Sequence, residues 1–237
     1  MADDLSDFLA RRQPTAQAPL AGLTVLAVED SRYSCEAIRL MCLRSGARLR
    51  RADCLRSARR HLQCYRPSVV IVDLGLPDGS GIELIRDLAR LRPRVPALIA
   101  TSGDSAWQMQ ALAAGADAFL AKPLESLSQF QSVILSALPD AARPVPVAAS
   151  PQDRVAPDAL ALRDDLAHLS ALLDGGGANL GYVGRFLSGI ARAAHDAPLQ
   201  AAAEALLRAS RSGLSAQAQI DRVARLIRDR LILPADL

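Results

Sequence analysis

The chain contains 237 residues, of which 50% are hydrophobic and 22% are charged. This length and apolar content allow one large domain or two small ones with buried cores, and they exclude a chain that is mostly disordered. The net charge of +3 is unevenly spread, because residues 22–138 carry 15 basic and 11 acidic side chains whereas residues 151–237 carry 10 of each, so the C-terminal part is not an obvious binder of polyanions.

Two features of the sequence concern the cellular compartment. The four cysteines are 7, 12 and 10 residues apart, without a Cys-x-x-Cys pair or a histidine at zinc-ligand spacing, which favours reduced thiols over a metal site or a disulfide framework. No basic and apolar leader opens the sequence, and no apolar run approaches the roughly 20 residues that span a bilayer. We therefore expect a cytoplasmic protein without a membrane segment.

The first 21 residues predict one short helical turn within a flexible N-terminal lead-in, to which we assign no function. From Leu23 onward, short apolar segments alternate with segments of helical periodicity. The expected elements are strand 23–28, helix 32–45, strand 48–52, helix 54–64, strand 68–73, helix 81–91, strand 97–101, helix 105–114, strand 118–121 and helix 125–138. Five strands that alternate with five helices predict an α/β domain over residues 22–138, with a doubly wound five-stranded parallel sheet and right-handed crossovers.

The second part of the chain follows a stretch rich in proline. Residues 139–157 contain five prolines and almost no apolar periodicity, which is typical of a stiff linker between domains. After it the sequence is rich in Ala and Leu at helical spacing, without a strand signal. We expect a small all-α helical domain over residues 158–237, with four helices at 158–173, 179–194, 198–211 and 215–232, the last of them capped by Ser215.

Chemically reactive side chains occur where four of the predicted strands end. Glu29 and Asp30 follow the first strand, Asp73 closes the third, Thr101 closes the fourth, and Lys122 follows the fifth. The carboxyl ends of parallel strands meet at one edge of a sheet, and open α/β sheets bind their ligands there. Lys122 is also the only lysine among the 28 basic residues, so an ammonium was kept at this position in a chain that otherwise uses arginine.

These side chains together predict a site for phosphoryl chemistry. Three carboxylates at adjacent strand ends repel one another, so they persist there only if they are protonated or if a hard cation lies among them. Oxygen ligands with room for water suit Mg²⁺. A phosphoryl group on Asp73 would then be held by the metal ion, by Lys122 and by the hydroxyl of Thr101, which is the electrostatic arrangement that phosphoryl transfer requires.

Each residue of this pattern has a simpler explanation when it is considered alone. Glu29 and Asp30 could cap the following helix, and Asp73 could form a turn before the Pro/Gly-rich segment. In the same way, Thr101 could simply end a strand, and Lys122 could be a solvated charge. The occurrence of all these residue types at four strand ends, in the required order, favours the functional interpretation.

The same residues resemble a known family. Glu29-Asp30, the segment Val-Asp-Leu-Gly-Leu-Pro-Asp-Gly-Ser-Gly at 72–81, Ala-Thr-Ser-Gly at 100–103 and Lys122-Pro123 resemble the receiver domain of two-component response regulators in residue type, spacing and order. The resemblance covers residues 22–138 and implies the flavodoxin-like, CheY-like fold of such receivers.

The resemblance also implies roles for individual residues. Asp73 would accept phosphate from a sensor histidine kinase or a histidine phosphotransfer protein, so the chain would be a phosphoacceptor with intrinsic autophosphorylation and autodephosphorylation rather than an enzyme. Thr101 and Lys122 would contact the phosphoryl group, and Phe119 would be the switch aromatic that follows Thr101. The ligands of Mg²⁺ would be Glu29, Asp30, Asp73 and the backbone carbonyl of Gly75.

The function of the helical domain is open to three hypotheses. Its balanced charge and apolar stripes favour a dimerisation or protein-interaction module that phosphorylation switches. A DNA-binding output is the alternative, because Gly213-Leu214-Ser215 with Ile220 faintly resembles a helix-turn-helix, although no basic recognition helix follows. The second alternative is a domain similar to histidine phosphotransfer proteins, with His168 or His195 as acceptor, although neither histidine is followed by the Lys-Gly of that family.

Overall fold

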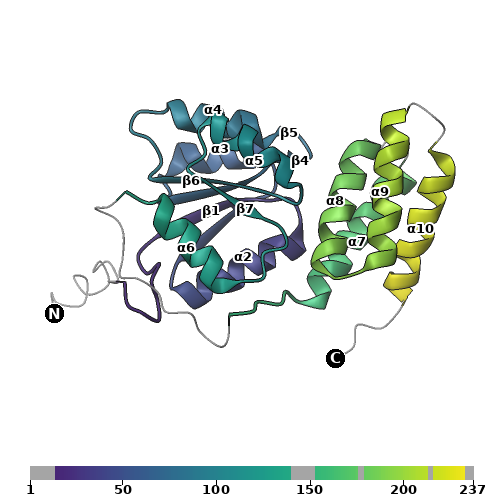
Figure 1. The fold of residues 1–237 in the computed structure, drawn as a ribbon, viewed down its shortest axis with the longest axis horizontal. Helices are drawn as coiled ribbons and strands as arrows, with labels where there is room; N and C mark the ends of the chain where they lie inside the picture. Colours follow the sequence, from purple (N-terminus) through teal and green to yellow (C-terminus); the bar gives the residue numbers. More distant parts are fainter. Residues whose placement is uncertain (1–13, 140–152, 176–178, 213–215, 233–237) are drawn as a thin grey trace.

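The structure is a computed structural model of the whole chain, and it describes residues 14–139, 153–175, 179–212 and 216–232. It consists of an α/β domain and a bundle of four helices that lies beside the carboxyl ends of the strands (Figure 1). The N-terminal residues 1–13, the central part of the proline-rich linker (140–152) and Ser215 lie outside the described residues. The helix-turn-helix resemblance at Gly213-Leu214-Ser215 therefore also lies outside them.

The α/β domain is built on one parallel sheet, as the sequence predicted. The strand order is β2-β1-β3-β6-β7. Every neighbouring pair in this sheet is parallel. The strands are β1 (Thr24–Val28), β2 (Arg48–Ala52), β3 (Val69–Asp73), β6 (Ala97–Ser102) and β7 (Ala118–Ala121). After β1 the chain adds β2 on one side of it, and the later strands β3, β6 and β7 lie on the other side. The order of the strands therefore switches between β1 and β3. In doubly wound folds such a switch point opens a crevice at the carboxyl ends of the strands.

Helices cover both faces of this sheet (Figure 1). The cluster on one face contains buried residues of α3 (Leu55–Cys64), α4 (Gly81–Arg90) and α5 (Gln108–Ala114). The cluster on the opposite face contains buried residues of α2 (Arg32–Ser45) and α6 (Leu127–Ala137). Strand β3 is buried on both sides, because Val70 and Val72 pack into the first cluster whereas Val69 and Ile71 pack into the second. This alternation follows from the two-residue period of a strand and leaves Asp73 at the end of the buried segment.

Two local features differ from the sequence prediction. The expected helix 105–114 begins with a 3₁₀ turn, Ser105–Trp107, which is capped by the carboxylate of Asp104 and continues as α5. The Pro/Gly-rich segment after Asp73 contains a short hairpin of β4 (Gly75–Leu76) and β5 (Gly79–Ser80), where the sequence indicated only a turn. Two-residue strands carry too little periodicity to be detected in a sequence.

The packed core of the α/β domain includes residues from both flanking segments. Leu20 is fully buried and its amide donates to the carbonyl of Ser45. Val155 is 1% exposed and its amide donates to the carbonyl of Glu125. The end of the linker therefore lies along the start of α6 before the chain enters the bundle.

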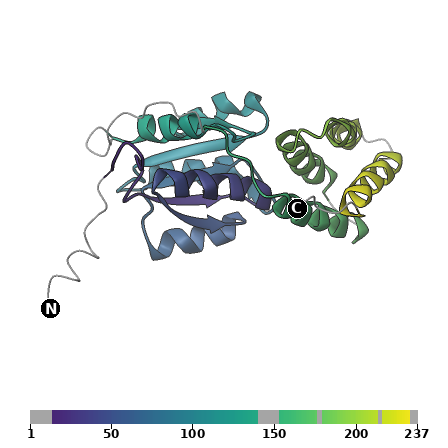
Figure 2. The ribbon, with the colours of Figure 1, turned by 90° about the horizontal axis from the view of Figure 1, so that it is seen from below.

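The bundle has a hydrophobic core of its own. Its helices are α7 (Ala159–Asp174), α8 (Leu180–Ala193), α9 (Ala197–Ser212) and α10 (Gln217–Ile232). Each contributes to one buried cluster, for example through Leu169, Leu187, Leu206 and Ile227. Gly184 allows α8 to lie close to α9, because a Cβ there would be 2.7 Å from Cγ of Leu207. Figure 2 shows the four helices from below, beside the sheet domain. Within the described residues, none of the helices combines the length and the apolar character needed to cross a membrane.

One glycine near the end of β3 tests how tightly this region is packed. A Cβ at Gly81 would lie 2.0 Å from the carbonyl oxygen of Asp73, whereas a Cβ at Gly75 would meet no atom within 4 Å. We expect Gly81→Ala to lower the free energy of unfolding by about 2 kcal/mol or more, because the start of α4 and the end of β3 would have to separate. Urea unfolding followed by circular dichroism measures this change.

Gly75→Ala is the matched control for that substitution. Gly75 has no positive φ angle, so alanine fits its backbone. The free energy of unfolding should change by no more than about 1 kcal/mol, in the stabilising direction. Equal destabilisation by the two substitutions would contradict the packing described here.

Candidate functional site

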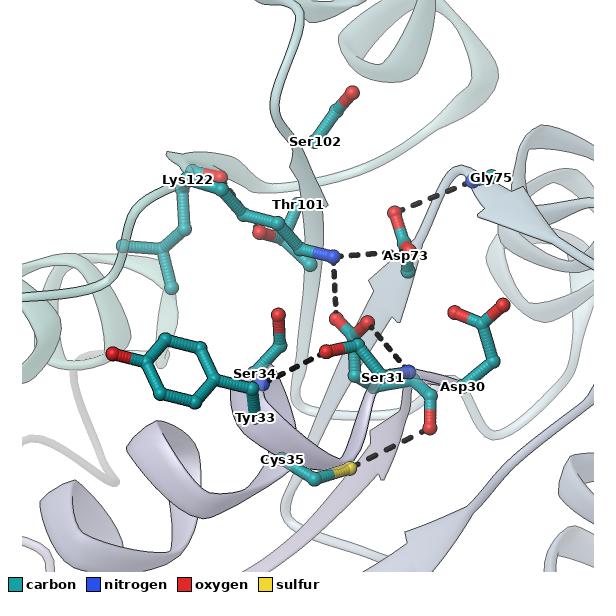
Figure 3. A network of polar contacts seen from close by, with 12 residues as sticks. Asp30, Ser31, Tyr33, Ser34, Cys35, Asp73, Gly75, Thr101, Ser102 and Lys122 are labelled. Carbon is teal, nitrogen blue, oxygen red and sulfur yellow. Dashed lines mark hydrogen bonds and ion pairs between the residues drawn. The ribbon is translucent and has the colours of Figure 1, made fainter. Parts of the chain in front are cut away.

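The residues singled out in the sequence meet at the carboxyl edge of the sheet. Glu29 and Asp30 directly follow β1, Asp73 is the last residue of β3, Thr101 lies near the end of β6, and Lys122 directly follows β7. In the register of the sheet, Asp73 is opposite Thr101. Because β1, β3, β6 and β7 are consecutive parallel strands, all these side chains lie at the carboxyl edge of the sheet. Figure 3 shows four of them, Asp30, Asp73, Thr101 and Lys122.

Three carboxylates form the centre of this cluster. Glu29, Asp30 and Asp73 each place one oxygen within 4.8 Å of the others. Oδ1 of Asp30 is buried and has no hydrogen-bond partner among the described residues. An unsatisfied buried carboxylate oxygen beside two further carboxylates is the donor set that a hard divalent cation takes. The residues present therefore fit a metal ion such as Mg²⁺.

The carboxyl groups of this cluster are difficult to ionise together when no metal ion is bound. Burial, and to a smaller extent the charge of Asp73, raises the pKa of Asp30 to about 7, against the opposing hydrogen bond from Tyr182. Burial also raises the pKa of Glu29 well above its ordinary range, and the nearby charge of Lys122 only partly offsets this effect. A cation would relieve both shifts, because it favours the ionised carboxylates.

Lys122 supplies the only positive charge among the residues that the sequence placed at these strand ends. Its Nζ lies 2.6 Å from Oε2 of Glu29 and 3.0 Å from Oδ2 of Asp73. Burial alone would lower the pKa of Lys122, but the carboxylates of Asp73 and Glu29 outweigh it and hold the pKa above its ordinary value. One ammonium balances only one of three ionised carboxylates, so a divalent cation could neutralise the other two.

The remaining residues predicted for the site lie around these charges. Thr101 is fully buried and its hydroxyl donates to the carbonyl of Leu120 at 2.8 Å. Phe119 is partly buried and packs against the core cluster that contains α4 and α5. The amide of Gly75 donates to Oδ1 of Asp73 at 3.2 Å, which fixes the direction of that carboxylate (Figure 3).

The helical bundle covers this site, and the sequence did not indicate this. Asp165 of α7 is 2% exposed and accepts hydrogen bonds from the hydroxyl of Ser31 at 2.7 Å, the amide of Arg32 at 2.8 Å and the amide of Tyr33 at 3.0 Å. These amides belong to the first turn of α2, where backbone donors lack partners within the helix. A carboxylate from the bundle thus caps the helix that follows Glu29 and Asp30.

A second contact from the bundle reaches a carboxylate of the cluster itself. The hydroxyl of Tyr182 in α8 donates to Oδ2 of Asp30 at 2.6 Å. Arg192, ten residues further along α8, donates to the carbonyl of Gly103 in the loop after β6. A cleft of about 460 Å³ lies between the two domains. Residues from both domains line it, among them Asp73, Lys122, Trp107, Arg185 and Gly189.

The sequence held only a weak signal for these contacts. Tyr182, Arg185, Gly189 and Arg192 recur at the spacing of one helix face, as any amphipathic helix would show. The partner of Tyr182 is 152 residues away in the chain, and that of Asp165 is 134 residues away. No local pattern specifies such a contact.

The two histidines considered as phosphate acceptors lie in different surroundings. The ring of His168 packs near that of Phe186, with ring centres 6.3 Å apart. His195 lies in the turn between α8 and α9 rather than on a helix, and its Nε2 is 3.2 Å from Oε1 of Glu125. The residues of α8 that line the cleft with Asp73 include Arg185, Gly189 and Arg192, and neither histidine is among the residues that line it.

Comparison with known proteins identifies the α/β domain. Residues 25–134 match the response regulator receiver domain family. The chain is 38% identical over 100 residues to the KDP operon transcriptional regulatory protein KdpE of Escherichia coli K12, covering 42% of this chain and 44% of KdpE. It is 32% identical over 117 residues to the virulence transcriptional regulatory protein PhoP of Salmonella typhimurium, covering 47% of this chain and 52% of PhoP. The chain thus spans about half the length of these curated relatives.

Solved structures are similar to about half of the chain. One is a putative response regulator from Chloroflexus aurantiacus, with a TM-score of 0.43, 24% identity and coverage of 47% of this chain and 97% of that chain. Another is the receiver domain of the sensor histidine kinase PA1611 from Pseudomonas aeruginosa, with a TM-score of 0.44, 26% identity and coverage of 49% and 98%. The predicted receiver fold is confirmed by the family match together with the strand order.

The raised pKa of Asp30 predicts a stability that depends on pH and metal. In the unfolded chain this carboxyl titrates near pH 4, whereas in the folded protein without metal its pKa is about 7. Its contribution to stability is therefore fully present below about pH 4 and is lost as the pH rises through about 7, a change of up to about 4 kcal/mol. Because a bound cation removes this cost, Mg²⁺ should raise the melting temperature more at about pH 8 than at about pH 5.5. Scanning calorimetry with Mg²⁺ or with a chelator measures both shifts.

Two variants serve as controls for this experiment. Asp30→Asn should reduce the difference between the two pH values, because one of the two carboxyls with a raised pKa is absent. Asp87→Asn, which changes an exposed aspartate of α4 outside the cluster, should behave as the unmodified protein does. An equal effect of Mg²⁺ at both pH values in the unmodified protein would contradict the prediction.

Proposed function

Because residues 25–134 form a response regulator receiver domain, we propose that this chain is a response regulator of a two-component phosphorelay, phosphorylated on Asp73 in a Mg²⁺-dependent reaction. The observation that carries the proposal is the cluster of Glu29, Asp30 and Asp73 with Lys122 at 3.0 Å from Asp73. The phosphodonor would be a sensor histidine kinase or a histidine phosphotransfer protein. The protein would act in the cytoplasm.

The proposed reaction is a transfer of one phosphoryl group. A carboxylate oxygen of Asp73 forms a bond to phosphorus while the bond between phosphorus and the donor atom breaks, and the donor leaves with that electron pair. Lys122 already pairs with Asp73, so its ammonium is placed to hold an oxygen of the incoming group. When bound by Glu29, Asp30, Asp73 and the carbonyl of Gly75, Mg²⁺ would supply charge neutralisation at the phosphoryl oxygens.

Thr101 and Phe119 are the proposed switch residues. The hydroxyl of Thr101 donates to the carbonyl of Leu120, directly after Phe119, so it links β6 to β7 in the unphosphorylated form. A phosphoryl group adds acceptor oxygens near this hydroxyl, and exchange of its partner would release the carbonyl of Leu120. The position of Phe119 beside that carbonyl supports its role in the switch.

The proposed output is a protein-interaction or dimerisation function of the helical bundle. Its own buried core supports an independent module rather than an extension of the receiver. The contacts of Asp165 and Tyr182 with the segment that carries Asp30 provide a direct route from the site to the bundle. A change of charge at Asp73 would therefore alter the surroundings of the interface.

Regulation of transcription through DNA binding is the second candidate. The relatives KdpE and PhoP are named as transcriptional regulatory proteins, which favours it. The match covers less than half of this chain, and the charge of residues 151–237 is balanced. A shift of duplex DNA in a gel by the whole chain, reduced by salt, would support this candidate over the first.

Phosphorylation of Asp73 can be tested with a small phosphodonor such as acetyl phosphate. We expect the intact mass of the protein to increase by one phosphoryl group when Mg²⁺ is present and not when it is chelated. Asp73→Asn should abolish this increase, whereas Asp87→Asn should retain it. Unchanged labelling of Asp73→Asn would place the acceptor elsewhere and contradict the proposal.

The proposed output has a separate test. Beryllofluoride with Mg²⁺ mimics the phosphorylated carboxylate, and light scattering after size exclusion reports the mass of the particle. We expect the mimic to change the oligomeric state of the whole chain or the elution position of the monomer. No difference between treated protein, untreated protein and Asp73→Asn would contradict a switch that acts through the bundle.

A further inference from the structure

We propose that the helical bundle completes the metal site of the receiver, with Tyr182 as a positioning residue that orients Asp30 toward the ion. The inference rests on the proposed function in one respect, namely that Glu29, Asp30 and Asp73 bind a divalent cation. It adds that the affinity of this site depends on a domain outside the receiver. Binding of Mg²⁺ and docking of the bundle would then reinforce each other.

The two oxygens of Asp30 have different surroundings. Oδ2 accepts the hydrogen bond of the Tyr182 hydroxyl at 2.6 Å. Oδ1 is buried and has no hydrogen-bond partner among the described residues. The carboxylate of Asp30 lies near that of Asp73 (Figure 3). One oxygen is thus held by the bundle, and the other remains available to an ion shared with Glu29 and Asp73.

A ligand held in this way binds more tightly than a mobile one. An aspartate side chain that rotates freely must be fixed when the ion binds, and a hydrogen bond to its second oxygen fixes it beforehand. Partners of metal ligands of this kind change metal affinity by about 10- to 100-fold when they are removed. Tyr182 is 9% exposed and lies on α8, between helices that share the buried core, so its own position is well determined.

Docking of the bundle does not depend on Tyr182 alone. Asp165 accepts three hydrogen bonds from Ser31, Arg32 and Tyr33, directly after Asp30. Arg192 holds the loop at Gly103 on the opposite side of the cleft. Removal of one hydroxyl at position 182 therefore leaves the bundle in place and changes only the support of Asp30.

The coupling must be reciprocal. If the docked bundle increases the affinity of the site for Mg²⁺, bound Mg²⁺ stabilises the docked bundle by the same factor. The backbone amides of Arg32 and Tyr33, which bond to Asp165 only in the docked arrangement, report on this equilibrium. Their hydrogen exchange should slow when Mg²⁺ is added to the whole chain.

The central experiment is a titration of the whole chain with Mg²⁺, followed by tryptophan fluorescence. Trp107 is the only tryptophan and lies in the cleft with Asp30 and Asp73. Tyr182→Phe should raise the dissociation constant for Mg²⁺ about tenfold or more. It should also weaken the effect of Mg²⁺ on exchange of the Arg32 and Tyr33 amides, and this readout requires no phosphorylation.

Tyr65→Phe is the matched control. The hydroxyl of Tyr65 is buried without a hydrogen-bond partner among the described residues, and Tyr65 lies at the end of α3, outside the cleft. Its loss should change the dissociation constant for Mg²⁺ less than twofold. A second variant, Asp165→Asn, weakens docking from a different residue and should also lower the affinity for Mg²⁺. Circular dichroism establishes that each variant is folded.

The outcomes separate the inference from the proposed function. An unchanged dissociation constant in both Tyr182→Phe and Asp165→Asn would overturn the inference and leave the metal site intact. Tighter binding in Tyr182→Phe would overturn it as well, because Tyr182 would then compete with the ion. Absence of Mg²⁺ binding in the unmodified protein would contradict both proposals, whereas Mg²⁺ binding without phosphorylation of Asp73 would contradict the proposed function alone.

Discussion

Electrostatic repulsion at the carboxyl edge of the sheet is the constraint on which the site depends. The parallel strands bring Glu29, Asp30 and Asp73 within 4.8 Å of one another, and Lys122 provides a single ammonium against them. Water cannot stabilise these charges well because the carboxylates are largely buried. Protonation, the ion pairs of Lys122 and a hard cation are the remaining ways to stabilise them. A site with this balance of charge is suited to receive both a divalent ion and a phosphoryl group.

The loop that follows β1 connects this chemistry to the rest of the molecule. It carries two of the carboxylates and leads into the first turn of α2, whose free amides need acceptors. Asp165 of the bundle supplies that acceptor, and Tyr182 of the bundle holds Asp30. The helical domain is therefore joined to the receiver at the segment that carries Glu29 and Asp30, two of the proposed metal ligands. A change in charge at Asp73 acts a few ångströms from this interface, so no long path of coupling is needed between the site and the bundle.

The bundle contributes shape as well as contacts. Gly184 allows α8 to pack closely on α9 within the bundle. On the other side of the same helix, a Cβ at Gly189 would meet no atom within 4 Å, so space remains above Lys122. The cleft of about 460 Å³ between the domains is consequently lined by charges of both signs, with Arg185 and Arg192 opposite the carboxylates. Small residues at two positions of one helix thus allow close packing within the bundle on one side and leave space toward the receiver on the other.

The sequence by itself determined most of the secondary structure, the parallel sheet and the identity of the residues at its carboxyl edge. Apolar runs of β-branched residues such as Val69–Val72 specify buried strands, and parallel order brings Asp73, Thr101 and Lys122 together whatever the details of packing. The hairpin at Gly75–Leu76 and Gly79–Ser80 escaped prediction because two residues carry no period. Only the tertiary structure decided that Asp165 and Tyr182 belong to the site. Their partners are more than 130 residues away, and a helix-surface aspartate or tyrosine has no local pattern that distinguishes a contact with another domain from exposure to water.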